Sequence, residues 1–337
     1  MKEITIIGGG LAGLTLGIAL RREGVPVTVC EAGSYPRHRV CGEFISGCGL
    51  ASLHQLGLLQ HVQQAGVHRA VTASFFSARR NCATKRLPEP AVCISRFVLD
   101  PLLAGLFCEA GGGLRTNCRW TRSFKSEAIV RASGRRPQPH ARGFRWYGLK
   151  AHAKNIGLTA DLEMHFSQDA YIGLCRLGDG SVNVCGLFRR APGRQSAADA
   201  DMLQGQAGTV FAERVGHAEW DYQSFSAVGG LPAFPELATE DCCVGDALAM
   251  PAPLTGNGMS MAFEAAELAA EPLRRYACGT LPWDDAVNEI HAKTRTAFRA
   301  RLRWSAILHR ILFHDAQPLL LRVALAYGWP WLFRATR

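Results

Sequence analysis

Three glycines near the start of the chain are spaced to bind a diphosphate. Gly8, Gly10 and Gly13 follow a short apolar run, Ile4–Ile7, and overlap the beginning of Leu11–Arg22, which has the composition of a helix. In such a turn the first glycine permits the tight bend and the second lets the backbone approach a pyrophosphate. The third allows the helix to pack closely on the strand. The spacing predicts a βαβ unit that binds a dinucleotide.

The helix that follows these glycines should offer its amino end to the phosphates. Free N–H groups in its first turn, at Leu11 and Ala12 among others, and the positive end of the helix dipole both favour an anion. A second apolar run ends at Glu31, where a carboxylate can accept hydrogen bonds from ribose hydroxyls. Glycines alone would indicate only a structural turn; with the strands and the acid, the segment indicates a dinucleotide site.

A second loop rich in Gly, Pro and Asn lies late in the chain and also leads into a helix. In VGDALAMPAPLTGNGMSMA, we expect the carboxylate of Asp246 to bind a chain of hydroxyls. A helix over about 259–271 would place its amino end where a reduced flavin develops negative charge. FAD needs a second loop of this kind and NAD does not. The residues predicted to contact FAD here are Asp246, Pro253, Gly256, Asn257, Gly258 and Met259.

These motifs together resemble a known superfamily. GGGLAG with Glu31, the internal SRFVLDPLL and VGDALAMPAPLTGNGMSMA follow the order found in the FAD-dependent superfamily of aromatic-ring hydroxylases, geranylgeranyl reductases and flavin-dependent halogenases. The resemblance implies FAD as cofactor and places Arg96, in SRFVLDPLL, beside it. Asp100 is carried over as well, with helix capping or a turn contact as its alternative role.

Two departures from the hydroxylase pattern bear on the electron donor. Ser133 and Gly134 stand where hydroxylases often have Asp-Gly, in a motif that serves both FAD and the reduced nicotinamide cofactor. Ala-Leu-Ala follows Asp246 where many hydroxylases have Ala-His, which moves the resemblance towards the reductases. The electron donor is therefore left open between NAD(P)H and a separate reductase.

The segment RHRVCGEFIS carries candidate catalytic groups. Cys41 and Gly42 resemble the Cys-Gly element of geranylgeranyl reductases, which lies close to the flavin ring. A thiol at Cys41 can give a proton to a substrate carbon, and flanking arginines such as Arg39, itself a candidate cofactor contact, would favour the thiolate. Gly42 would leave room for the ring, and Glu43 is a candidate acid or base. The alternatives are an inert buried cysteine, an exposed carboxylate and solvated arginines.

Short β-branched and aromatic runs in the middle of the chain predict a meander-like sheet. The runs are WYGLKAHA, LEMHFS, AYIGLCRLG and SVNVCGLFRR, and GDG at 178–180 indicates a hairpin between the last two. Tyr171 is the third catalytic candidate, because AYIGLCRLGDGSVNV resembles a degraded Tyr-x-Trp-x-Phe-Pro segment of geranylgeranyl reductases. His152, His165 and Asn183 are further pocket-facing candidates, each of which is more typical of an ordinary sheet residue. No histidines and carboxylates have metal-site spacing, so no metal is expected.

The predicted fold is α/β, with a Rossmann-like FAD-binding domain interleaved with a mixed or antiparallel substrate-binding sheet and a C-terminal helical tail. We assign 1–70, 80–140 and 238–290 to the FAD-binding domain. The sheet domain comprises 71–79, which is expected to pair with the central runs, and 141–237. The basic helical segment comprises 291–337.

The chain of 337 residues has a formal net charge of +10, and much of this excess lies in the C-terminal tail. From position 293 onward nine Lys or Arg face a single Asp. An amphipathic helix followed by a short hydrophobic one is expected there, either resting on an anionic membrane surface or covering the substrate sheet. No nucleic-acid recognition motif accompanies the charge. The twelve cysteines form no C-x-x-C, and with no signal peptide or spanning segment expected, we predict a cytoplasmic protein, with a peripheral membrane location as the alternative.

The resemblance implies an FAD-dependent oxidoreductase of the monooxygenase type. Its expected substrate is a small lipophilic or aromatic metabolite of secondary, isoprenoid or polyketide metabolism. A geranylgeranyl-reductase-like enzyme that reduces a C=C bond with Cys41 near the ring is the alternative. A flavin-binding protein without catalysis is the alternative from another class, and a non-flavin NAD-dependent dehydrogenase is a more distant one.

Overall fold

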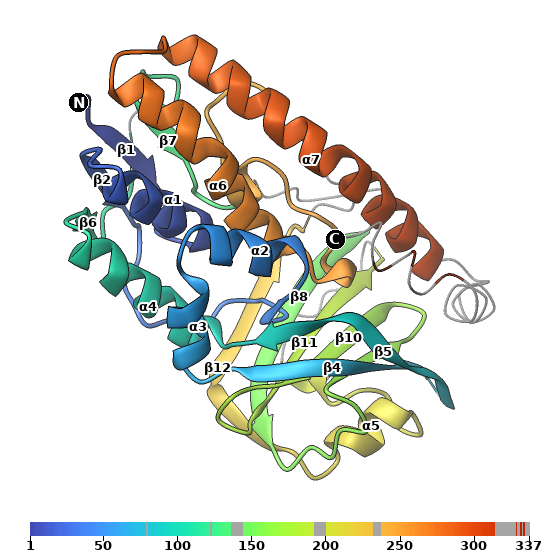
Figure 1. Ribbon diagram of the computed structural model, residues 1–337. Helices are drawn as coiled ribbons and strands as arrows, with labels where there is room; N and C mark the ends of the chain where they lie inside the picture. The colour runs from blue at the N-terminus through green and yellow to red at the C-terminus, as the bar shows by residue number, and fades with distance from the viewer. Residues whose placement is uncertain are drawn as a thin grey trace.

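The structure is a computed structural model of the whole chain, and α7 and α6 run along one side of it (Figure 1). It describes all residues except 79, 122, 136–143, 192–199, 232–236, 314–327, 329–330, 332 and 334–337.

A parallel four-stranded sheet in the order β6-β2-β1-β7 carries the predicted glycine turn. Its strands are short and largely buried: β1 (Ile4–Ile7), β2 (Val27–Cys30), β6 (Gly113–Arg115) and β7 (Ile129–Arg131). The run that precedes Asp246 lies beside it, since Cys243 bridges to Arg131 in parallel. Both loops predicted from the sequence therefore leave the same end of one parallel sheet, where ligands of such sheets bind.

Helices pack around this sheet and fill its core with small and aliphatic side chains. Helix α1 (Leu11–Arg22) has the predicted bounds and contacts α4 (Arg96–Glu109) and α6 (Gly258–Ala277). Helix α6 begins where expected but continues through Pro272 to Ala277, six residues beyond the predicted end. The short helices α2 (Cys48–Gln55) and α3 (Leu59–Gln64) follow, and α2 also contacts α6.

A second sheet of eight strands has the order β12-β8-β11-β10-β9-β4-β5-β3. All pairs are antiparallel except β4 with β9, which are parallel. The GDG turn joins β10 and β11 as predicted, and the 71–78 run lies in β4. The strands are β3 (Phe44–Ile45), β4 (His68–Ser77), β5 (Arg80–Cys93), β8 (Arg145–Lys154), β9 (Leu162–Phe166), β10 (Ala170–Arg176), β11 (Val182–Arg190) and β12 (Glu219–Gly229).

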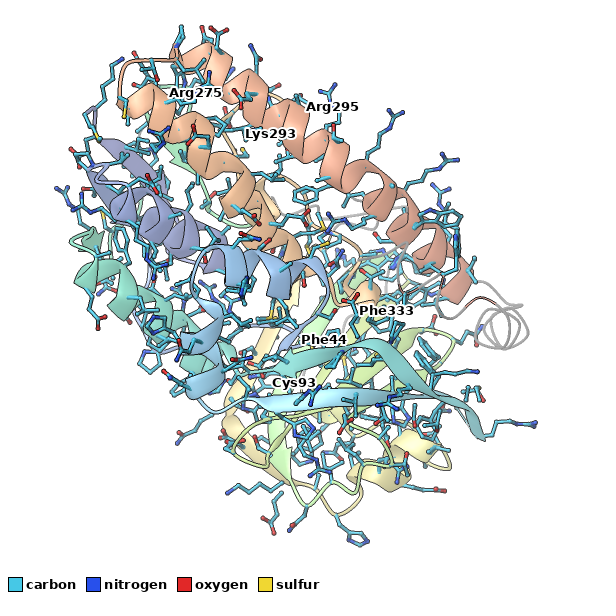
Figure 2. The ribbon with its side chains drawn as sticks, viewed as in Figure 1. Phe44, Cys93, Arg275, Lys293, Arg295 and Phe333 are labelled. Atoms are coloured by element: carbon cyan, nitrogen blue, oxygen red, sulfur yellow. The ribbon has the colours of Figure 1, made fainter. Side chains whose placement is uncertain are left out.

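The two faces of the large sheet differ in what they contact. One face packs its aliphatic side chains against η1 (Ala200–Leu203) and α5 (Val210–Val215). The other face carries a separate apolar cluster that includes Phe44, Cys93 and Phe333. Phe44 and Cys93 are register partners on β3 and β5, and Figure 2 shows Phe333 close to them. This second face, because it turns towards the helices, forms a wall of the functional cavity.

Helix α7 (Trp283–Leu312) extends from the parallel sheet to the large sheet (Figure 1). Both guanidinium NH groups of Arg301 bind the carboxylate of Glu264 on α6 at 2.6 Å, which fixes one helix on the other. Within the described part of the chain, no helix has the length and apolarity needed to cross a membrane. The short hydrophobic helix expected after α7 lies mostly outside the described residues.

The predicted fold class is confirmed, since the chain combines a Rossmann-like sheet, a curled mixed sheet and a helical C-terminus. The domain boundaries stay a prediction. One of them, at residue 80, coincides with the β4–β5 hairpin, so β5 continues the large sheet although it was assigned with the FAD-binding segments. Sequence patterns mark hairpin turns but do not show which sheet a second strand joins.

Candidate functional site: a cavity between the two sheets

One cavity of about 1770 Å³ begins at the glycine turn and ends beneath α7. Its polar end is lined by Gly8, Gly10 and Glu31, and its middle by the turn 39–43 and the late loop. Its far end is formed by the large sheet and α7. The segments predicted to bind FAD and those predicted to bind substrate thus border one continuous space.

The glycine turn has the geometry that the spacing predicts. Gly8 has a φ of 113°, and a Cβ there would lie 2.2 Å from the Ala132 carbonyl oxygen. A Cβ on Gly13 would lie 2.0 Å from the carbonyl oxygen of Gly8. A Cβ on Gly10, by contrast, would meet no protein atom within 4 Å. Gly8 and Gly13 are therefore required by the backbone, whereas Gly10 borders open space, as does the first turn of α1 at Leu11 and Ala12.

Glu31 lines this end of the cavity, and three hydrogen-bond donors fix its carboxylate. Its carboxylate accepts hydrogen bonds of 2.8 Å from the amides of Gly9 and Gly33 and from the guanidinium of Arg37. Burial raises the pKa of Glu31, but the bonds from Arg37 and the two amides outweigh it and lower the pKa to about 2. The carboxylate stays ionised at neutral pH, as the predicted contact with a ribose requires; Arg37 acts as its partner rather than as a solvated side chain.

The late loop places Asp246 and the start of α6 against the middle of the cavity. Asp246 lines the cavity. Desolvation of its carboxylate raises its pKa, and the nearby Arg96 and Arg135, which lower the pKa, do not fully offset this effect. The 3-10 turn η3 (Pro253–Thr255) ends at Gly256, which has a φ of 61°. The amino end of α6 follows at Asn257, with no side-chain cap. Of the residues predicted in this loop, Pro253, Gly256, Gly258 and Met259 line the cavity, and Asn257 lies buried beside them.

Arginines converge on the same region. Arg39 and Arg96 both line the cavity. Arg96 donates from Nε to Asp100 at 2.5 Å and from a terminal nitrogen to the other carboxylate oxygen at 2.8 Å. Asp100 thus orients Arg96 through an ion pair one helical turn apart within α4. The FAD contact carried over for Asp100 and its alternative roles stay predictions.

The turn at Cys41 and Gly42 is anchored to the large sheet. The Asn183 side-chain amide donates to the Cys41 carbonyl at 3.0 Å, and the Cys175 thiol donates to the Gly42 carbonyl at 3.2 Å. A Cβ on Gly42 would meet no protein atom within 4 Å, so the turn faces open cavity. Burial raises the pKa of Cys41 even though Arg96 lowers it. This shift favours a neutral thiol, which can donate a proton, over the expected thiolate.

Glu43 is the centre of a buried polar network, so the alternative of an exposed carboxylate is wrong. Its side chain is 0% exposed. One oxygen accepts from the Arg96 amide at 2.8 Å, and the other lies 2.7 Å from Nε2 of His152. Nζ of Lys150 lies 3.5 Å from the carboxylate and 3.0 Å from Nδ1 of His38. Burial raises the pKa of Glu43, but His152 and Lys150 together with the amide bond lower it further than burial raises it.

The remaining candidates of the central sheet separate into two groups. His152 and Asn183 contact the 41–43 turn through the bonds described above. His165 instead lies 3.0 Å from Glu163 and stacks on Phe76 at 4.6 Å between ring centroids. Tyr171 lines the cavity on β10. Within the described ranges, no group of His, Cys, Asp or Glu side chains could hold a metal ion.

The far half of the cavity is almost wholly apolar, and α7 forms one of its walls. The sequence left open whether this helix covers the substrate sheet or rests on a membrane. The helix turns one face inward and exposes arginines such as Arg303 and Arg295 on the other, the latter visible in Figure 2, while Arg301 is buried against Glu264. This arrangement supports the tail as a cover of the substrate sheet, while contact with a membrane stays a prediction. The apolar lining comprises Phe75, Leu87, Met164, Phe166, Leu187, Leu231, Met250, Leu254, Trp304, Ile307, Leu308, Ile311, Leu312 and Phe333.

Two further sets of residues at the site carry no sequence signal of their own. Arg119, Trp120 and Phe124 border the polar end of the cavity from the segment between β6 and β7. Lys150 and His38 join the Glu43 network from positions that read as an ordinary strand and an ordinary loop. Only the alternation along β8, which puts Lys150 and His152 on one face, hints at their common role.

The residues present fit FAD. Gly10, Gly42 and Gly258 line the cavity, and a Cβ on each would point into space free of protein atoms. Two helices, α1 and α6, direct amino ends without side-chain caps at the same space. Arginines that line the cavity, among them Arg37, Arg39 and Arg96, supply positive charge. A long, dianionic, partly planar molecule suits this combination.

Comparisons with known proteins agree with this geometry. Residues 1–133 match the family described as FAD binding domain. Menaquinone reductase of Mycobacterium tuberculosis is 24% identical over 324 residues, which cover 80% of this chain and 76% of that protein. The 6-methylpretetramide 4-monooxygenase of Streptomyces rimosus is 29% identical over 119 residues, covering 34% of this chain and 28% of that protein.

Solved structures show the fold over nearly the whole chain. PqsL of P. aeruginosa, in complex with 2-aminobenzoylacetate, has a TM-score of 0.71 at 17% identity and covers 96% of this chain and 100% of its own. The flavin-dependent brominase Bmp2 has a TM-score of 0.73 at 16% identity, covering 99% and 93%.

The chain is similar to the FAD-dependent oxidoreductase superfamily in its motifs, in the FAD binding domain matched by residues 1–133 and in its fold. It is an FAD-dependent oxidoreductase, and FAD is its cofactor. The resemblance, the enzyme class and the cofactor predicted from the sequence are confirmed.

Proposed function

We propose that the enzyme is an FAD-dependent monooxygenase that hydroxylates a lipophilic or aromatic molecule. The observation that carries this proposal is the continuity of the cavity. The half that is lined by the predicted FAD contacts opens directly into an apolar half that α7 closes. A substrate bound there would meet the cofactor out of contact with water. Two likenesses support the choice, to a monooxygenase of Streptomyces rimosus and to PqsL bound to an aromatic ligand.

Bound FAD would supply the two-electron redox chemistry and the activation of oxygen, while the side chains of this chain position and enclose the reactants. Gly8, Gly10 and the first turn of α1 would hold the diphosphate, and Asp246 the ribityl hydroxyls. The amino end of α6 would stabilise negative charge on the reduced ring. Glu43, through its bonds to the Arg96 amide and to His152, holds the 41–43 turn rigid at the cavity wall. Leu308 and its neighbours on α7 exclude water.

The neutral thiol of Cys41 favours a second candidate, the reduction of a C=C bond. A protonated cysteine at the cavity wall can deliver a proton to a carbon that receives hydride. The likeness to menaquinone reductase, which extends over 80% of the chain, also supports this candidate. Hydroxylation requires no acid at this position, so the role of Cys41 separates the two candidates.

The decisive experiment measures oxygen incorporation in a single turnover. Photoreduced holoenzyme is mixed with a lipophilic phenol such as 4-octylphenol under ¹⁸O₂, and with 4-octylphenol or an apolar enone without oxygen. The proposal predicts a product that carries one ¹⁸O atom, no product without oxygen, and unchanged yield in Cys41→Ser. A product formed without oxygen, and lost in Cys41→Ser, would establish the reductase instead. Reoxidation of FAD with no product from any acceptor would overturn both.

A further inference from the structure

Tyr171 is a polar side chain buried in the apolar half of the cavity. It is 4% exposed, it lines the cavity, and among the residues that the structure describes its hydroxyl has no hydrogen-bond partner. A buried hydroxyl without a partner destabilises the fold. Native proteins seldom retain such a group unless a ligand or a water satisfies it.

Two more groups without partners lie around the same spot. Nε1 of Trp146 and both ring nitrogens of His309 are buried and make no hydrogen bond to any residue that the structure describes. The three side chains meet at Phe313, whose ring centroid lies 4.8 Å from Trp146, 5.0 Å from His309 and 6.2 Å from Tyr171. Strands β8 and β10 and helix α7 each contribute one of them. Of these three side chains Tyr171 is the one that lines the cavity, so its hydroxyl is the group that a polar ligand atom can meet.

The protonation states suit an uncharged partner. Burial, with a smaller effect of Cys185, raises the pKa of Tyr171 well above its usual value, so the hydroxyl keeps its proton and can donate it. Burial and the nearby Arg189 lower the pKa of His309 to about 4. His309 is thus neutral at pH 7, with one N–H donor and one acceptor nitrogen.

The sheet register places this group at the end of the cavity away from the Cys41 turn. Cys175, which bonds the Gly42 carbonyl, and Tyr171 lie on the same face of β10, four residues apart. At about 3.3 Å per residue this corresponds to roughly 13 Å along the strand. Leu187 and Phe166, the register partners of Tyr171 on β11 and β9, flank it in the apolar wall of the cavity.

We propose that Tyr171, supported by His309, is a recognition site for a single hydroxyl or carbonyl oxygen at the end of an elongated, otherwise apolar substrate. The inference rests on the proposed function, because it takes the apolar half of the cavity as the substrate site. It narrows the substrate class to molecules whose one polar end lies remote from the carbon that faces the Cys41 turn. Tyr171 is then a specificity-determining residue rather than the catalytic residue predicted from the sequence.

The test measures binding to the oxidised holoenzyme, without turnover. Two ligands that differ by one hydroxyl, 4-octylphenol and octylbenzene, are titrated while the absorption of FAD or the fluorescence of tryptophan is followed. Wild type should bind the phenol roughly tenfold more tightly, the effect of one satisfied buried hydrogen bond. Tyr171→Phe should abolish this preference and leave the affinity for octylbenzene unchanged. His309→Phe should reduce the preference in part.

Tyr222→Phe is the matched control, because Tyr222 is 66% exposed on β12 and lies outside the cavity. It should keep the full preference. The inference is overturned if wild type binds both ligands equally, if Tyr171→Phe keeps the preference, or if Tyr171→Phe weakens both ligands alike. Because no oxygen or reductant is present, a failure of hydroxylation leaves this result untouched, and the reverse also holds.

Discussion

The two ends of the cavity are built in opposite ways. At the diphosphate end, a contiguous turn presents backbone amides, and its geometry is imposed by two glycines whose Cβ atoms would overlap carbonyl oxygens. At the α7 end, apolar side chains from β10, β8 and α7 meet across the whole length of the chain. We therefore expect cofactor binding to depend on a few adjacent backbone positions, where substitutions are poorly tolerated. Substrate binding is distributed and should respond to changes gradually.

The largest effect should come from adding a side chain inside the glycine turn. In Gly13→Val, the new Cβ would lie 2.0 Å from the Gly8 carbonyl oxygen, so α1 must move off β1. We expect a loss of about 3 kcal/mol or more in the free energy of unfolding, together with loss of FAD from the purified protein. Urea unfolding and the FAD content released by denaturation measure both.

Gly10→Ala separates cofactor approach from folding in the same turn. Its Cβ meets no protein atom, so the apoprotein should keep its Tm while the Kd for FAD rises at least about tenfold. Gly105→Ala on the exposed side of α4, where a Cβ also meets nothing, is the control and should change neither value for the worse. Normal FAD affinity in Gly10→Ala would refute a close approach of the diphosphate to this turn.

A smaller, pH-dependent loss of stability is expected from a change at Glu43, in the middle of the cavity. Glu43→Gln leaves the buried Lys150 without its counter-charge and should cost roughly 3 kcal/mol at pH 7. Since folding lowers the pKa of Glu43, its stabilisation is complete above the unfolded pKa of about 4.3 and is lost as the pH falls through the lower folded pKa. The difference between wild type and variant should therefore shrink below about pH 4.

The double variant Glu43→Gln with Lys150→Met is the control for this charge pair. Removing both charges should restore part of the stability lost in Glu43→Gln. Thermal unfolding across pH 3–8 measures all three proteins. A constant difference at every pH would show that packing, rather than ionisation of Glu43, accounts for the loss.

The smallest effect should come from the distributed end. Leu308→Ala removes part of the apolar wall on α7, and we expect a KM roughly three- to tenfold higher for a lipophilic substrate, with an unchanged Kd for FAD. Arg303→Ala, on the exposed side of the same helix, should alter neither value. A loss of FAD affinity in Leu308→Ala would break the proposed separation between the two ends.

The same contrast explains how much the sequence could predict. The β1–α1 unit was predicted to the residue, because glycine spacing and strand composition are local properties. The late loop was predicted for the same reason. The Glu43 network was not, since Lys150 and His38 are 112 residues apart and neither belongs to a motif. Tyr171 was named for a motif likeness, whereas its unpaired hydroxyl becomes visible only once β10, β8 and α7 are packed together.

The parallel pairing of β4 with β9 has a consequence for how the chain can be divided. Residues 1–133, the part that matches the FAD binding domain family, include β4 and β5 but not β9. A fragment cut there would present the outer row of β4 amides and carbonyls to solvent, beside Phe75 and Phe76, which are buried in the intact protein. Such an unpaired, aromatic-flanked edge invites self-association. The cofactor-binding portion is therefore expected to need the middle of the chain for its solubility, in addition to the substrate-binding role proposed for that part.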